Sequence, residues 1–183
     1  MIAWRVLPVD PAAATDAAGG PLWFPRDYQG AARHDNPDAY GCLYVAQTPM
    51  SAVAEALSPF RGRGALTAAM LERAGRPLSL VALDLREPHG LLDLDEPATL
   101  AAEGLRPSGV ATRVRATTQR DALRLFHSHR RATGLSWWST IEASWINLTI
   151  FDRARRRLRV RSVELLGTGH EAVRGAAAEL GLA

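Results

Sequence analysis

The sequence contains no lysine, because all 22 of its Lys and Arg positions are arginines. A P-loop lysine is therefore excluded, and so is a lysine Schiff base to pyridoxal phosphate or to a carbonyl substrate. Alanine, glycine and proline are abundant as well, which indicates a coding bias as the origin of the lysine gap. Any anion that this chain binds must be held by arginines, backbone amides or helix ends.

Cysteine is almost as scarce, because Cys42 is the only one. A single thiol excludes an internal disulfide and a multi-thiolate metal site, which fits a reducing cytoplasm. Cys42 lies in the apolar run 42–46, which is typical of a buried strand. We therefore expect an inert core thiol rather than a nucleophile.

Long apolar runs are missing too. Arg5, Pro8 and Asp10 interrupt the start of the chain before the apolar segment of a signal peptide could form. No uncharged apolar run reaches the ~18–20 residues that a membrane span needs. We expect a cytoplasmic protein that has no membrane partner.

The chain nevertheless has the length and apolar content of one domain, with 183 residues of which 47% are hydrophobic. The apolar patterns predict strands at 1–8, 42–46, 78–85, 135–138, 145–151 and 158–166. They predict helices at 48–58, 66–74, within 93–104, at 117–131 and in the last segment, 167–183. Because these elements do not alternate as βαβ units, the expected fold class is α+β, a single domain over 1–183. Its β core is expected to be mixed, mostly antiparallel and flanked by helices.

The densest charge run is the arginine-rich segment 153–161. From Leu158 onward, leucine or valine alternates with arginine, which places the arginines on the solvent face of a half-buried strand. A groove for nucleic acid would also need interleaved aromatic residues that stack on bases, and this run has none. The pattern favours a solvated hairpin, and direct nucleic-acid binding stays open as the alternative.

The histidines and glycines do not form a recognisable cofactor motif. His127 and His129 are two residues apart and would point to different faces of a helix, and the other histidines are scattered: His34, His89 and His170. We therefore expect no metal. Gly62, Gly64 and Gly75 lie in an arginine-containing loop without the strand–glycine–helix context of a Rossmann nucleotide site.

Four separate polar residues form a quieter candidate set: Arg33, Tyr44, Glu55 and Ser139. Glu55 has no arginine three or four positions away on its expected helix, whose neighbouring side chains are small or apolar. A ligand would have room beside it, although an ordinary surface glutamate stays open. Ser139 follows two tryptophans at a strand end, without the His–Asp arrangement that activates a serine nucleophile.

The spacing around these residues resembles the RES domain, a family named for its characteristic Arg, Glu and Ser. The matching segments are 30–37, 43–46 and 50–55, and the steps from Arg33 to Tyr44 and from Tyr44 to Glu55 are both eleven residues. Segments 4–6, 117–119, 134–139 and 147–151 resemble further family motifs, with Ser139 as the family serine. The resemblance covers about residues 2–166. Ala31, Ala32 and His34 depart from the family's usual glycines and aromatic residue.

The resemblance implies an ADP-ribosyltransferase-like fold and an enzyme that consumes NAD, acting as the toxin of a bacterial toxin–antitoxin pair. The reaction is hydrolysis or phosphorolysis of the nicotinamide–ribose bond, with transfer of ADP-ribose to a protein as the alternative. The implied partner is an Xre-type helix-turn-helix antitoxin. A non-catalytic binding module and a homo-oligomer also stay open.

The resemblance also assigns roles to the candidate residues. Glu55 would stabilise the positive charge that develops on the ribose, because the bond breaks through an oxocarbenium-like transition state. Arg33 and Arg5 would bind the pyrophosphate or ribose, and Tyr44 and Ser139 would contact the substrate. We expect Arg33, Tyr44, Glu55 and Ser139 to converge on one cleft, with Arg5 at its edge.

Overall fold

A computed structural model describes residues 1–86 and 90–182, and its chain forms two compact units. Unit 1 consists of segments 1–23, 46–85 and 159–183, and unit 2 consists of 24–45 and 86–158. His89, considered above as a metal ligand, lies outside the described residues, as does the last residue of the predicted C-terminal segment.

Unit 1 contains most of the N-terminal and C-terminal elements of the chain. They are β1 (Ile2–Leu7), α1 (Pro49–Leu57), η2 (Ser58–Phe60), η3 (Ala68–Leu71), β3 (Glu72–Arg73), β4 (Arg76–Pro77), β5 (Ser79–Leu85), β9 (Leu158–Leu165) and α5 (Glu171–Leu180). Strands β1 and β5 pair antiparallel, from Ile2 opposite Asp84 to Leu7 opposite Ser79, and β9 follows β5 at the sheet edge. The strands predicted at 1–8, 78–85 and 158–166 are thereby confirmed.

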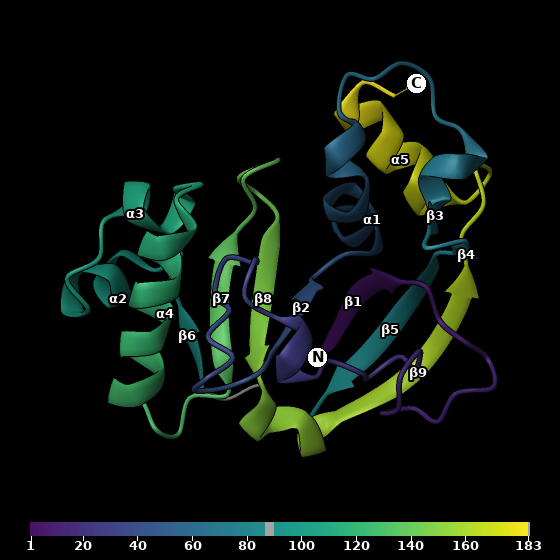
Figure 1. The fold of residues 1–183 in the computed structure, drawn as a ribbon. Helices are drawn as coiled ribbons and strands as arrows, with labels where there is room; N and C mark the ends of the chain where they lie inside the picture. The colour runs from purple at the N-terminus through teal and green to yellow at the C-terminus, as the bar shows by residue number, and fades with distance from the viewer. Residues whose placement is uncertain (87–89, 183) are drawn as a thin grey trace. The chain divides into compact units, whose positions relative to one another are not determined.

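Helices α1 and α5 lie side by side in unit 1 (Figure 1). The side chain of Thr48 accepts a hydrogen bond from Ser51 N at 3.1 Å, and Pro49 opens the helix, as the sequence predicts. At the far end of α5, Gly181 adopts φ +66°, the left-handed conformation that ends many helices. The buried positions of both helices are largely alanine and valine, which allows the two backbones to approach closely.

Unit 2 contains the elements from the middle of the chain. They are η1 (Arg26–Tyr28), β2 (Cys42–Ala46), β6 (Leu91–Asp93), α2 (Pro97–Ala102), α3 (Pro107–Ala111), α4 (Arg115–Ser128), β7 (Gly134–Trp138), β8 (Ile146–Phe151) and η4 (Asp152–Arg157). Ala46, the last residue of β2, already belongs to unit 1, where Trp4 of β1 pairs with it. The strand order is β6-β7-β8-β2-β1-β5-β9, with β6 parallel to β7 and the described pairs β7–β8, β2–β1 and β1–β5 antiparallel. The predicted α+β class, with a mixed sheet flanked by helices, is confirmed.

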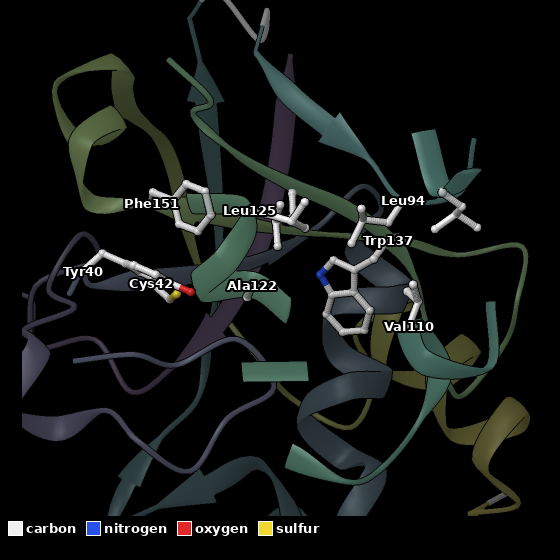
Figure 2. Close-up of a cluster of buried hydrophobic side chains, with 10 residues drawn as sticks. Tyr40, Cys42, Leu94, Val110, Ala122, Leu125, Trp137 and Phe151 are labelled. Carbon is white, nitrogen blue, oxygen red and sulfur yellow. The ribbon is translucent and has the colours of Figure 1, made fainter. Parts of the chain in front are cut away.

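A hydrophobic cluster forms the core of unit 2. Figure 2 shows Tyr40, Cys42 and Phe151 at one end of the cluster and Trp137 and Val110 at the other. The rings of Tyr40 and Phe151 pack edge to face, with centroids 4.8 Å apart. Cys42 is buried, as predicted, and burial raises the pKa of its thiol above the usual range, which disfavours the reactive thiolate.

One predicted helix is wrong, and some short elements were missed. The helix predicted at 66–74 is only the short 3-10 turn η3, because Ala74 and Gly75 both adopt positive φ and turn the chain from β3 into β4. The short elements β6 and α3 were not predicted, since three and five residues are too few to show a period.

The arginines of the segment 153–161 are largely exposed, as their pattern predicts, but the predicted hairpin is wrong, because β8 and β9 are not neighbours in the strand order. Arg159 and Arg161 of β9 are exposed, as expected from the alternation. Arg153 is exposed as well, but it also stacks over the Phe126 ring at 3.6 Å and donates hydrogen bonds to the carbonyls of Phe126, His129 and Arg130. It therefore caps the C-terminal end of α4, where unpaired carbonyls favour a cation.

Gly134 is required by the close approach of β7 and β8. A Cβ at this position would lie 2.2 Å from the carbonyl oxygen of Thr149, which is backbone and cannot rotate away. We predict that Gly134→Ala lowers the free energy of unfolding, measured in denaturant titrations, by about 1–3 kcal/mol or more. Gly109→Ala in α3 is the matched control, because a Cβ there meets nothing within 4 Å. Equal stability of the two variants would contradict the prediction.

Candidate functional site

Arg33 is carried by a loop, residues 30–36 (the Arg33 loop), that is held by the carboxylate of Asp35. Asp35 Oδ2 accepts hydrogen bonds from Gly30 N and Ala32 N, both at 2.8 Å. Its other oxygen, Oδ1, accepts a hydrogen bond from the Tyr44 hydroxyl at 2.7 Å. Asp35 is buried, so these three bonds replace the water that a carboxylate loses on burial.

The first turns of α4 hold the opposite side of the same loop. Gln119 Nε2 donates hydrogen bonds to the carbonyls of Gly30 and Ala32, both at 2.9 Å. The Thr118 hydroxyl donates to the carbonyl of Arg33. Amide and carbonyl groups of the loop are thus bonded to side chains from the loop itself and from α4.

The side chain of Arg33 is buried, with 5% of its surface exposed, and its contacts with the backbone of Val110 and Thr112 and with Trp137 set its direction. Nη1 donates to the carbonyls of Val110 and Thr112 at 2.7 and 2.8 Å, and the guanidinium carbon lies 4.8 Å from the centre of the Trp137 ring. A guanidinium can make in-plane hydrogen bonds and stack its face at the same time.

Tyr44, on β2, binds the Arg33 loop through its hydroxyl. The oxygen accepts a hydrogen bond from His34 N at 2.9 Å while the proton is donated to Asp35. Burial, followed by the nearby Cys42 and Asp35, raises the pKa of Tyr44 well above its ordinary value, so the phenol stays protonated. The predicted pair Arg33 and Tyr44 therefore belongs to one hydrogen-bonded network.

His34 stands where the RES pattern has an aromatic residue, and its ring packs as one. It lies edge-on to Trp137, with centroids 5.3 Å apart, and its Nδ1 is 2.8 Å from the Thr149 hydroxyl. Burial, together with the charges of Arg33 and Arg115, lowers the pKa of His34 to about 3. The imidazole is therefore neutral at physiological pH.

Ser139 lies in unit 2, just after the end of β7, and only 1% of its surface is exposed. Its hydroxyl oxygen accepts a hydrogen bond from Ile141 N at 3.0 Å, and its own N–H donates to the Trp145 carbonyl at 2.7 Å. The serine is thus built into the turn between β7 and β8, directly after the strand whose end the sequence predicts at Trp138.

The two other candidates belong to unit 1. Glu55 is half-buried on α1, among the small buried residues of that helix. Arg5, on β1, donates to the Pro21 carbonyl at 3.0 Å, and burial lowers its pKa to about 10. Arg5 therefore remains a cation at neutral pH despite losing water. Their joint action with Arg33 remains a prediction from the motif spacing.

Sequence reasoning missed the residues that hold the loop. Asp35 and Gln119 both lie in segments that resemble RES motifs, but no role was assigned to either. Apart from the Tyr44 hydroxyl that bonds to Asp35, their partners are backbone atoms, and those of Gln119 are 87 and 89 residues away in the sequence. The available signal was an acidic residue two positions after Arg33, directly before an Asn-Pro turn.

Other features of the described chain bear on cofactors and membranes. No group of three His, Cys, Asp or Glu residues could hold a metal ion among residues 1–86 and 90–182. His129 Nε2 lies 2.7 Å from a Glu103 carboxylate oxygen, an acidic partner that the local sequence does not indicate. Over the same ranges, no helix combines the length and apolarity needed to cross a bilayer.

The chain is thus an α+β protein with a mixed sheet, and hydrogen bonds to backbone carbonyls fix the direction of its buried Arg33 side chain. The chain belongs to the RES domain family, whose model matches residues 2–171. A solved structure with a similar fold is a chain from the crystal structure of the M. tuberculosis MbcT–MbcA toxin–antitoxin complex. Its TM-score is 0.64 at 18% identity, over 99% of this chain and 87% of that chain. Comparison with curated proteins gave no match.

The neutral His34 predicts a pH dependence of stability. Because its pKa is about 3 when folded and about 6.5 when unfolded, only the unfolded chain binds the proton between these values. Stability is therefore complete above pH 6.5 and falls as the pH drops towards 3. Between pH 7 and pH 5, the protonation of His34 in the unfolded chain should lower the free energy of unfolding of the wild-type protein by about 2 kcal/mol. We predict that this loss is absent in His34→Gln.

Denaturant titrations at the two pH values measure this difference directly. His127→Gln is the control, since His127 is exposed on α4 and its substitution should leave the wild-type pH dependence intact. If the free energy of unfolding of His34→Gln falls between pH 7 and pH 5 as much as that of the wild-type protein, the pH dependence is not due to this ring.

Proposed function

We propose that this chain is the toxin of a toxin–antitoxin pair and that it consumes NAD by cleaving the nicotinamide–ribose bond. Membership of the RES family and the fold shared with a chain of a toxin–antitoxin complex support the first part. The observation that carries the second part is the buried, directionally fixed guanidinium of Arg33 in the motif that names the family.

The chemistry needs a stabiliser of positive charge rather than a general acid. When the bond from the ribose C1′ to the ring nitrogen breaks, its electron pair goes to nicotinamide, which leaves as a neutral molecule. The ribose then carries oxocarbenium-like positive charge, and a carboxylate beside it lowers the barrier. Glu55 has this role in the proposal. Water or phosphate then adds to C1′, and water gives up its proton to solvent or to Glu55.

The other groups bind and orient the dinucleotide. Arg5 stays charged in a desolvated position on β1, where its attraction for a pyrophosphate oxygen is stronger than in water. Arg33 supplies a second permanent cation whose direction is fixed before the substrate arrives. The Tyr44 ring and the Ser139 hydroxyl contact the ribose or nicotinamide in this proposal.

The finer assignments follow from the same family. We propose an Xre-type helix-turn-helix antitoxin as the partner and the cytoplasm as the compartment. Hydrolysis, phosphorolysis and protein ADP-ribosylation share the bond-breaking step and differ only in the acceptor. Mass spectrometry of the products distinguishes them, because they yield ADP-ribose, its phosphorylated form or a modified protein, respectively.

Glu55→Gln tests the proposal most directly, because it removes the charge and keeps the shape of the side chain. We predict that NAD consumption by purified protein, with phosphate present, falls on the order of 100- to 1,000-fold, about 2.7–4 kcal/mol of barrier. Glu179→Gln is the matched control, an exposed glutamate on α5. Wild-type turnover by Glu55→Gln would exclude the carboxylate mechanism, and no NAD loss with the wild-type protein would exclude the activity.

A further inference from the structure

The Arg33 loop depends on side chains for its backbone hydrogen bonds. Among the described residues of the loop, 30–35 share one backbone–backbone hydrogen bond, from Asp35 N to the Ala32 carbonyl. This bond is long, at 3.4 Å. Neither a strand nor a helix includes this segment. Gly30 and Ala31 are exposed, so little packing restrains the first half of the loop. Its conformation is therefore set by Asp35 on one side and by Gln119 on the other.

We propose that Asp35 is a positioning residue for the reaction, with Gln119 as its counterpart on α4. The inference rests on the proposed function. Asp35 binds Gly30 N and Ala32 N, while Gln119 binds the carbonyls of the same two residues. These four hydrogen bonds, which we call the clamp, hold the peptide groups before Arg33 from both sides. They fix the direction in which the Arg33 side chain extends from the loop.

Tyr44 extends the clamp to the residue that follows Arg33. Its hydroxyl accepts from His34 N and donates to Asp35 Oδ1, so one phenol joins the carboxylate to the loop backbone. The Arg33 carbonyl is bonded to the Thr118 hydroxyl. With the backbone fixed before and after it, the buried guanidinium keeps its bonds to Val110 and Thr112, and Asp35 acts on the substrate only through Arg33.

Three variants of the chain test this role: Asp35→Ala, Arg33→Ala and the double variant. Asp35→Ala removes all three hydrogen bonds, and we predict that kcat/KM for NAD falls on the order of 100-fold, as expected when a fixed group is misplaced by about 1 Å. In the Arg33→Ala background the same substitution should cause no further loss, because a positioning residue has nothing left to position. A merely structural residue would lower activity in both backgrounds.

Asp35→Asn and Asp38→Asn are the companion variants. Asn at position 35 keeps one oxygen for the two amides, so it should retain more activity than Asp35→Ala. Asp38 is exposed in the turn that follows, so its variant should match the wild-type protein. If Asp35→Ala does not fold, Asp35→Asn takes its place in the double-variant test. Hydrogen exchange at Gly30 N and Ala32 N, which should accelerate in Asp35→Ala, reports on the clamp without reference to activity.

Independent losses in Asp35→Ala and Arg33→Ala would overturn the positioning role while leaving the proposed function intact, and so would wild-type turnover by Asp35→Ala. Unchanged exchange at Gly30 and Ala32 would overturn the clamp itself. If neither the wild-type protein nor Asp38→Asn consumes NAD, the proposed function fails, and a role in positioning for that reaction fails with it.

Discussion

The hydrogen bonds to the buried carboxylate of Asp35 are the constraint on which the rest of the candidate site depends. A desolvated carboxylate is costly unless its oxygens are bonded, and here two amides and a phenol provide those bonds. The same bonds determine the path of the Arg33 loop, and that path determines where the Arg33 side chain lies within unit 2. Stability of the carboxylate and direction of the guanidinium therefore have one cause.

The absence of lysine acquires a structural meaning at Arg33. The guanidinium uses one nitrogen for two carbonyl oxygens and places its face over the indole of Trp137. An ammonium group could bond the carbonyls, but it has no planar face to stack and its pKa falls readily on burial. Arg5 shows that an arginine keeps its charge on burial, because its pKa is lowered only to about 10. A coding bias towards arginine is thus compatible with buried, permanent cations.

The periodic parts of the fold could be predicted from the sequence, and the residues that hold the site could not. Strands such as 42–46 and the helix beginning at Thr48 follow from apolar patterning and capping, which are local. The motif spacing predicted that Arg33 and Tyr44 lie close together. Gln119 and Arg153 act on backbone carbonyls 23 to 89 residues away, and bonds between a side chain and distant backbone have no period. A resemblance can mark such residues as part of a motif without giving their role.

The departures of this chain from the usual RES pattern are compatible with the loop geometry. Gly30 is the position in the Arg33 loop with positive φ, at +140°, whereas Ala31 and Ala32 adopt conformations open to any L-residue. Alanine at these two positions therefore adds no backbone strain. His34 is neutral and packs its ring against Trp137, so it fills the space of an aromatic residue without adding a charge beside Arg33. The clamp depends on backbone amides and carbonyls, which alanine provides as well as glycine does.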